Sequence, residues 1–386
     1  MSGMLVLFHC ESNPGFAASS HEHTFLSVAE SLTADISDIH FAYSRLDGGM
    51  TPSLPEELRN VIRLNTTWSD PQKIRAIEDY VRKHRITRLL GFDQPVYQPM
   101  YQALRSGGIK TFVSYWGAPM SSPNSGVKLL LKKLEVALRK TGPDHFIFQS
   151  EGMRETAVGG RGIPEARTSV VKTGINTDRF FPDVSKKFYA HDCFDIPKDR
   201  KIVVFSGHME KRKGVHVILK AATFLVGGLG RKDVHFLILG NRPGEIDNFS
   251  EYLQNESVNA HITFGGYRGD IPDLLKSCSI GMIASTEWDS FPMSSLEMAA
   301  TELPLLVSNL PGLNEAVTPL TGITFPVNDH EAAASSLDSL LDAPEKLREY
   351  GRRARQRVIQ EYSQKSQAQG ILSVFQALEQ SMEQAS

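Results

Sequence analysis

Short apolar runs alternate with longer segments of helical periodicity along almost the whole chain. Gly, Pro or Asp bounds most of these runs, and this alternation is typical of βαβ units built around parallel sheets. The sequence therefore predicts an α/β protein with two sheets. A first series of strands is expected over 4–9, 39–43, 87–92, 111–115 and 145–149, and a second over 201–206, 234–239, 261–264, 280–284, 305–308 and 322–325.

The chain of 386 residues exceeds what one hydrophobic core usually organises, so two domains are expected. A turn-rich segment without periodicity, 173–183, separates the two strand series and suits a linker. We expect an N-terminal domain over 1–178 and a C-terminal domain over 185–365. The tail from 344 to 383 has a nearly unbroken helical pattern, and its end, 368–386, is expected to cross back onto the first domain.

Composition favours an ordinary globular protein, with 41% apolar and 22% charged residues. The formal net charge of −2 gives no general attraction to nucleic acid, so no nucleic-acid partner is expected. Three scattered cysteines form no CxxC pair, which fits a reducing compartment. The apolar run at 4–10 lacks the flanks of a signal peptide. A cytoplasmic location is therefore expected.

Common phosphate-binding motifs are missing from the sequence. It contains neither GxxxxGK[ST] nor a GxGxxG after a strand, which argues against the usual NTPases and dehydrogenases. It also lacks an Asp-x-Asp at a strand end that would hold a divalent metal between phosphates. We expect no metal site and no bound cofactor, so a diphosphate ligand would need a metal-free site.

The segment 285–315 is the richest in polar groups that follow a strand. A strand ends near Ala284, a loop follows, and a helix is expected to begin near Met293. Ligands of open α/β sheets bind outside the carboxyl ends of strands, and a helix start there offers free N–H groups to phosphate. The expected cradle comprises Phe291, Pro292, Met293 and Ser294.

Two acidic residues, Asp289 and Glu297, bracket this cradle. Carboxylates beside phosphate are unfavourable unless they bind other groups, and the hydroxyls of a sugar or ribose are candidates. An alternative interpretation of Glu297 is structural. The sequence from Ser294 to Glu297 matches a capping box, in which the glutamate would bind the start of its own helix, and spacing alone slightly favours this cap.

Several motifs together resemble glycosyltransferase family 4. The segment 289–297 (DSFPMSSLE), followed by MAA, resembles the acidic-x7-Glu motif of that family. The segments 204–214 (VFSGHMEKRKG), 171–182 (VKTGINTDRFFP), 264–275 and 311–315 follow the order and spacing of other family motifs. The resemblance covers 165–365 well and the first half of the chain loosely.

The resemblance implies the GT-B fold, in which two Rossmann-like domains face each other across a cleft. It further implies a retaining, metal-independent glycosyltransferase that uses a nucleotide-diphosphate sugar, with UDP-glucose as our choice of donor. The acceptor would be a glycan or a lipid-linked sugar, and polysaccharide biosynthesis is the common setting of the family.

Residue roles carried over from the family concern the donor. Lys213 would contact the diphosphate and stabilise the leaving group, Asp289 would hold hydroxyls of the transferred sugar, and Glu297 would bind the ribose. Backbone groups of Tyr267 and Arg268 would contact the nucleobase. Without the resemblance, the basic residues 211–213 are better interpreted as a solvated loop.

The chain also departs from the family pattern. His208 stands where the family commonly has Arg beside the phosphates, and Trp116 stands where the first domain usually offers a histidine. Trp116 could stack on a sugar or be a core aromatic, and Asp93 is a second acceptor-side candidate. Gly15 is the candidate for close backbone approach to the donor.

A basic amphipathic helix is expected over 127–140 (VKLLLKKLEVALRK). It could dock on anionic lipid, which would make the protein peripheral at the inner membrane face. The favoured interpretation is a helix packed on the core with a lysine-rich solvent face.

Two other functions remain compatible with the sequence. A nucleotide-sugar epimerase or hydrolase would use the same donor site with a different reacting group. A non-catalytic nucleotide-sugar-binding protein would explain the residues found at 116 and 208.

Overall fold

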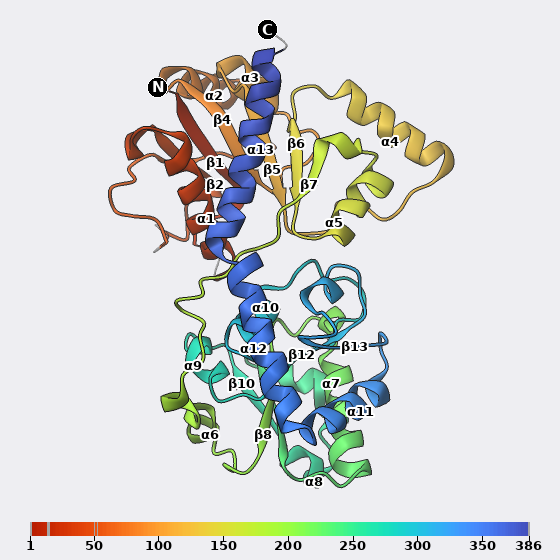
Figure 1. The fold of residues 1–386 in the computed structure, drawn as a ribbon. Coiled ribbons are helices and arrows are strands. Elements are labelled where there is room, and N and C mark those ends of the chain that lie inside the picture. Colours follow the sequence, from red (N-terminus) through yellow and green to blue (C-terminus); the bar gives the residue numbers. More distant parts are fainter. Residues whose placement is uncertain (1, 14–15, 50, 52, 385–386) are drawn as a thin grey trace. The chain divides into compact units, whose positions relative to one another are not determined.

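The computed structural model describes residues 2–13, 16–49, 51 and 53–384, and the chain forms two compact units (Figure 1). Unit 1 comprises Met1–Gly174 together with Gln364–Ser386, and unit 2 comprises Ile175–Ser363. The first boundary, between 174 and 175, lies four residues before the expected limit at 178 and ten before that at 185. The second, between 363 and 364, lies two residues before the expected limit at 365 and four before that at 368. Each unit has its own sheet and its own core.

Unit 1 is built on a seven-stranded parallel sheet with the order β3-β2-β1-β4-β5-β6-β7. Its helices are α1 (Phe16–Leu32), α2 (Pro71–Lys83), α3 (Tyr101–Gly107), α4 (Gly126–Leu138), α5 (Glu151–Glu155) and α13 (Gln364–Gln384). The strands are β1 (Gly3–Glu11), β2 (Ile39–Arg45), β3 (Val61–Arg63), β4 (Ile86–Phe92), β5 (Thr111–Trp116), β6 (His145–Phe148) and β7 (Thr168–Val170).

Both faces of this sheet are covered, which explains why β1 is a continuous apolar run. Because side chains alternate along a strand, Met4, Val6 and Phe8 pack in the cluster that contains residues of α1 and α13. Leu5 and Leu7 pack instead against residues of α2 and α3. Unit 1 is thus a doubly wound α/β domain.

The C-terminal helix α13 belongs to unit 1, as expected. Ala368, Ile371 and Phe375 are buried in the cluster that also holds strands β1, β2, β4 and β5. Gln367 ties the helix to the sheet, because its amide donates to the Tyr115 hydroxyl over 2.8 Å and accepts from the Gly174 N–H over 2.9 Å. The predicted return of the last helix to the first domain is confirmed.

Unit 2 contains a six-stranded parallel sheet with the order β10-β9-β8-β11-β12-β13. Its helices are α6 (Tyr189–Phe194), α7 (Val215–Ala222), α8 (Glu256–Asn259), α9 (Ile271–Leu275), α10 (Met293–Ala300), α11 (His330–Leu341) and α12 (Pro344–Glu361). The strands are β8 (Lys201–Ser206), β9 (Val234–Leu239), β10 (Ile262–Gly266), β11 (Ile280–Ile283), β12 (Leu305–Ser308) and β13 (Gly322–Phe325).

Strand β8 divides the core of unit 2 in the same way as β1 divides that of unit 1. Val203 and Phe205 pack with α7 and α11, whereas Ile202 and Val204 pack with α9, α10 and α12. The predicted α/β architecture with two parallel sheets is confirmed.

The structure corrects three local expectations. The edge strands β3 and β7, of three residues each, were not predicted, because so short a run has no periodicity to detect. The tail expected to be nearly unbroken is two helices, α12 and α13, that end and restart around Tyr362 and Ser363. Ser363 pairs there with Ile175 in a parallel bridge, which a continuous helix would exclude.

The third correction concerns α4. The favoured interpretation, a helix packed on the core with its lysines in solvent, is wrong for most of its apolar residues. Val136 is buried, but Val127, Leu130, Leu131, Leu134 and Leu138 are all exposed. Within the described ranges, no helix is long and apolar enough to cross a membrane.

Candidate active site

The strand order of unit 2 reverses between β8 and β11, since β9 and β10 lie on one side of this pair and β12 and β13 on the other. In open α/β sheets such a reversal leaves a crevice at the carboxyl ends of the two strands, where ligands bind. The loops that leave these ends are residues 207–214 and 284–292. They carry five of the eleven donor residues expected from the sequence, namely His208, Lys213, Asp289, Phe291 and Pro292.

Lys213 of the first loop and Asp289 of the second contact each other. The Lys213 ammonium donates to both carboxylate oxygens of Asp289, over 3.0 and 2.8 Å. The Asp289 side chain is 4% exposed and that of Lys213 is 15% exposed, so the pair is largely withdrawn from water. Ser285 supports the acid, because its hydroxyl donates to Asp289 Oδ2 over 2.7 Å. The ammonium is therefore held in one place beside the carboxyl ends of β8 and β11.

The neighbouring loop residues hold the two segments together. The Thr286 N–H donates to the Arg212 carbonyl over 2.7 Å, and the Arg212 guanidinium lies 3.9 Å from the centre of the Trp288 ring. Lys211 is exposed, so the three consecutive basic residues have different environments. Of these three, Lys213 is the one that contacts the buried acid.

Glu297 lies in the second turn of α10 and is 6% exposed. Burial raises the pKa of its carboxyl from 4.5 to about 7, and the charge of Arg179 opposes the rise. The capping-box interpretation is wrong, because α10 begins at Met293 with Pro292 as its N-cap residue. Ser294 is thus already inside the helix, whereas the serine of a capping box is the N-cap residue just before the helix.

The four expected cradle residues have different environments. Phe291 is buried, with its ring edge-on to Tyr362 at 5.2 Å between centroids. Pro292 has no N–H to offer a phosphate. Met293 and Ser294 are half-buried and occupy the first turn of α10, whose leading N–H groups have no partner within the helix itself. Anion binding at this helix start would therefore rest on residues 293 and 294.

Three further expected donor residues follow β8 and β10 of the same sheet. His208 is exposed directly after β8. Tyr267 is exposed after β10, and the neighbouring Arg268 pairs with Asp270 over 2.6 Å. Gly15 lies outside the described residues.

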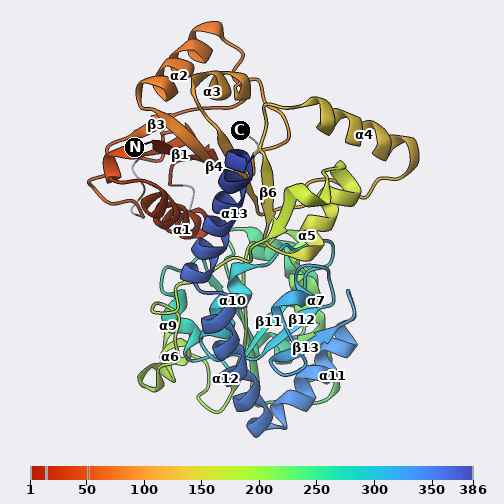
Figure 2. The same cartoon turned by 45° about the horizontal axis from the view of Figure 1, so that its top comes forward.

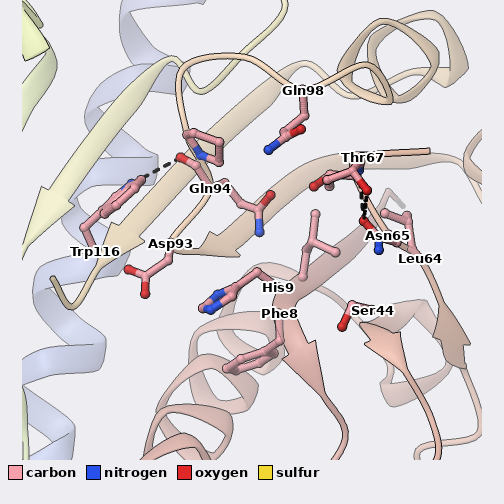
Figure 3. A pocket seen from close by; sticks show the side chains of 13 residues that line it. Phe8, His9, Ser44, Leu64, Asn65, Thr67, Asp93, Gln94, Gln98 and Trp116 are labelled. Carbon is pink, nitrogen blue, oxygen red and sulfur yellow. Dashed lines mark hydrogen bonds between the residues drawn. The ribbon is translucent and has the colours of Figure 1, made fainter. Parts of the chain in front are cut away.

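Unit 1 has its own strand reversal, between β1 and β4, and a cavity of about 390 Å³ lies there (Figure 3). This volume is within the range of small-molecule sites. Asp93 and Trp116, the two acceptor-side residues expected from the sequence, both line it. The other lining residues are Leu7, Phe8, His9, Ser44, Leu64, Asn65, Thr66, Thr67, Gln94, Pro95 and Gln98.

Asp93 follows β4 in an unusual conformation with φ of 51°. Non-glycine residues in this region cluster at functional sites. Its Oδ1 accepts from the Gly117 N–H over 2.8 Å. Burial raises the pKa of Asp93, and this hydrogen bond and the charge of His9 oppose the rise. Figure 3 shows the His9 ring pointing toward Asp93 at the cavity.

Trp116 combines the two roles considered for it. Its indole N–H donates to the Gln94 carbonyl over 3.1 Å, and its ring packs against a buried cluster that contains Val96 and Phe148. One part of the side chain lines the cavity. The core thus fixes the position of the Trp116 side chain, and a sugar could stack only on the part of the ring that faces the cavity.

Three further residues belong to these sites and were not among the site residues expected from the sequence. Ser285 lies at the start of the loop that follows β11. Its position just after a strand end could have suggested that its hydroxyl belongs to the site. Arg179 influences Glu297 from a segment far away in sequence. His9 ends a strand that resembled a buried run, and its role depends on the neighbouring β4.

The fold and these sites define a class: doubly wound α/β proteins that bind a ligand at the carboxyl ends of parallel strands. Comparison with known proteins narrows it. Residues 190–357 match the family model described as "Glycosyl transferases group 1". This segment lies inside unit 2 and includes Lys213, Asp289 and Glu297.

Curated relatives carry transferase names. A UDP-Gal:alpha-D-GlcNAc-diphosphoundecaprenol alpha-1,3-galactosyltransferase of Escherichia coli is 24% identical over 225 residues, which are 58% of this chain and 57% of the relative. An N,N'-diacetylbacillosaminyl-diphospho-undecaprenol alpha-1,3-N-acetylgalactosaminyltransferase of Campylobacter jejuni is 30% identical over 208 residues, 53% of this chain and 52% of the relative. The chain thus spans about half the length of these relatives. The family match and these names support a transferase enzyme.

Solved structures share the fold over nearly the full chain. A glycosyltransferase from Rickettsia africae superposes with a TM-score of 0.80 at 19% identity, covering 97% of this chain and 98% of that protein. Anabaena HepE in complex with UDP superposes with a TM-score of 0.77 at 15% identity, covering 97% and 100%.

Proposed function

We propose that this protein is a retaining glycosyltransferase of the GT-B type that transfers a sugar from a nucleotide-diphosphate donor without a metal ion. UDP-glucose is our working donor, and the acceptor is a glycan or a lipid-linked sugar. The observation that carries the proposal is the Lys213–Asp289 pair at the strand reversal of unit 2, within the segment that matches the glycosyltransferase family.

Lys213 supplies the positive charge that the leaving diphosphate requires. An ammonium has three donors, and the two oxygens of Asp289 engage it without enclosing it, since 15% of the Lys213 side chain is exposed. A fixed cation aimed at developing negative charge is the common electrostatic device of group transfer. The half-buried start of α10 adds N–H groups at Met293 and Ser294.

The two acids bind hydroxyl groups of the donor. Asp289 keeps its carboxylate near the phosphate only because Lys213 neutralises it, and it can accept from a sugar hydroxyl as well. Glu297 accepts from the ribose hydroxyls when it is ionised. The sugar, the diphosphate and the ribose would then lie in order from Asp289 past Lys213 to Glu297.

The acceptor would bind at the cavity of unit 1. Its volume of about 390 Å³ suits a sugar, Asp93 offers a carboxylate to a hydroxyl, and Trp116 offers part of an aromatic face. The relatives named above act on diphosphoundecaprenol-linked sugars, and this acceptor class is part of the proposal. In the retaining mechanism that we propose, the acceptor hydroxyl attacks on the side of the departing diphosphate and passes its proton to it.

A transfer assay tests the proposal. The full chain is incubated with UDP-, GDP- and ADP-sugars and a polyprenyl-diphosphate-linked sugar, with and without EDTA, and the product and its anomeric configuration are determined by NMR. We expect one donor to be used in EDTA with retention. Lys213→Met should lower kcat by roughly a hundredfold or more, whereas Lys211→Met, which changes an exposed neighbour, should leave it unchanged.

The other outcomes discriminate between functions. Hydrolysis of the donor at the same rate with and without the acceptor would indicate a hydrolase. Formation of the epimerised donor would indicate an epimerase. Tight donor binding with neither product would indicate a binding protein. Equal activity of the two lysine variants would contradict the role given to Lys213.

A further inference from the structure

Helix α4 has two apolar faces on opposite sides, and only one of them packs on the protein. At about 100° per residue, Leu129 and Val136 lie on one side of the helix. Val136 is buried in the cluster with Phe148 and Ile163, and Leu129 is half-buried. The opposite side carries a second set of residues at helical spacing, namely Val127, Leu130, Leu131, Leu134 and Leu138.

The second face is strongly exposed. Its five side chains are between 54% and 73% exposed, although all are Val or Leu. Scattered exposed leucines are ordinary, but a continuous apolar stripe marks an interaction surface. In both views α4 lies at the margin of unit 1, with α5 as its nearest labelled helix (Figures 1 and 2).

Cations flank the exposed stripe on both sides. Lys128 and Lys132 lie on one flank and Lys133 on the other, and Arg139 and Lys140 follow the end of the helix. The acid within the helix, Glu135, is engaged by Arg161 over 3.0 Å and lies 3.9 Å from Lys132. The chain as a whole has a formal charge of −2, so this positive region is local.

We propose that α4 docks on an anionic phospholipid bilayer. The apolar stripe would enter the boundary between headgroups and acyl chains, and the flanking lysines would reach the phosphates. A second copy of this chain or a protein groove would also cover apolar residues, but neither accounts for lysines on both flanks of the stripe. Charge complementarity therefore favours a lipid surface.

Docking would also serve the proposed function, and this part of the inference rests on it. Strand β5 ends at Trp116, which lines the cavity of unit 1, and the loop of residues 117–125 connects this strand end to α4. The chain thus leaves the cavity edge of the sheet just before it forms α4. A lipid-linked acceptor would be presented to that edge from the membrane.

Vesicle sedimentation of the full chain tests the docking without any donor or acceptor. The vesicles are phosphatidylglycerol mixed with phosphatidylcholine, and phosphatidylcholine alone. We expect binding to the anionic vesicles that weakens with salt. Leu130→Gln/Leu134→Gln should lower the partition coefficient roughly a hundredfold. Lys128→Gln/Lys132→Gln should lower it roughly fivefold per lysine.

The matched control is Leu229→Gln/Leu320→Gln, which changes two leucines of unit 2 that are 52% and 55% exposed. It should bind vesicles as the unchanged protein does. Absence of binding, or equal binding by the helix variant and the control, would overturn the proposal. Leucine-dependent dimers in ultracentrifugation without vesicle binding would also overturn it and assign the face to a second copy.

Both leucine variants should keep their Tm, because they change exposed residues, and should still be stabilised by a donor. Donor stabilisation tests unit 2 alone. If the protein is stabilised by a donor but does not bind vesicles, only the docking role of α4 is contradicted. If it binds vesicles but is not stabilised by any donor, only the proposed transfer function is contradicted.

Discussion

At the residue scale, Gly214 determines how closely the lysine loop approaches the end of β11. It has φ of 70°, and a Cβ at this position would lie 1.7 Å from the Ala284 carbonyl oxygen. Both the left-handed conformation and the backbone contact require glycine. Because Lys213 directly precedes it, the same contact fixes the ammonium beside Asp289.

Gly214→Ala should therefore destabilise unit 2 and disturb the donor site. We expect a loss of about 3 kcal/mol or more in the free energy of unfolding, together with weaker donor binding. Gly230→Ala is the matched control, because Gly230 has φ of 72° and nothing within 4 Å of the added Cβ. It should cost only about 1 kcal/mol. Equal losses in chemical denaturation would contradict the role of the Ala284 contact.

The raised pKa of Glu297 predicts that the stability of the protein depends on pH. Its folded pKa of about 7 exceeds the ordinary value of 4.5, so between these pH values the unfolded chain has lost a proton that the folded chain keeps. Stability contributed by this group thus falls as pH rises through this interval and stays low above it. The full penalty is on the order of 3 kcal/mol.

Glu297→Gln should relieve this penalty. The variant should gain several degrees in Tm over the unchanged protein at about pH 8 and little at about pH 5, as scanning calorimetry can measure. Glu287→Gln, an exposed change on the adjacent loop, serves as the control. A gain that is the same at both pH values would show that burial of the charge is not its cause.

Individual residues of the donor site were predictable to different degrees. The resemblance singled out Lys213 among three consecutive basic residues, and the structure pairs that one with Asp289. Spacing alone favoured a cap at Glu297, and the helix start at Met293 excludes it. Arg179 could not be found, because its influence on Glu297 depends on how the chain enters unit 2 rather than on any local pattern.

At the scale of elements, α13 contributes to the core of unit 1 from the far end of the chain. Phe375 is fully buried there beside residues of α1, β1 and β5. Phe375→Ala should lower the stability of unit 1 by about 3–5 kcal/mol. Gln376→Ala, which changes an exposed neighbour, should have little effect.

Hydrogen exchange measures the local stability of the Phe375→Ala variant residue by residue. Protection should fall in β1 and β5 while the strands of unit 2, such as β8, keep theirs. Equal loss of protection in β8 would show that the two units do not unfold separately.

Predictability also varied among the elements. Strands such as β8, β9, β12 and β13 were predicted to the residue, because buried parallel strands are continuous apolar runs. Helix α4 was predicted as a helix, but its packing was not. Its sequence contains two apolar stripes, and periodicity does not say which stripe packs on the protein and which stays exposed.

At the scale of the whole molecule, each unit repeats one principle. Its parallel sheet reverses strand order once, and the candidate site lies at that reversal, between β1 and β4 in unit 1 and between β8 and β11 in unit 2. The fold class and the number of sheets followed from the alternation of strands and helices. The division of roles between the sites followed from the family resemblance, because composition carries no information about it.

The central claim is that unit 2 binds a nucleotide diphosphate through Lys213 without metal. Isothermal titration of the full chain with UDP in EDTA tests it most directly, comparing Lys213→Met with Lys211→Met. We predict binding by the unchanged protein and by Lys211→Met, and a Kd at least about tenfold weaker for Lys213→Met. Equal affinity of both variants, binding only when a divalent metal is added, or no binding of UDP, GDP or ADP at all would contradict the account.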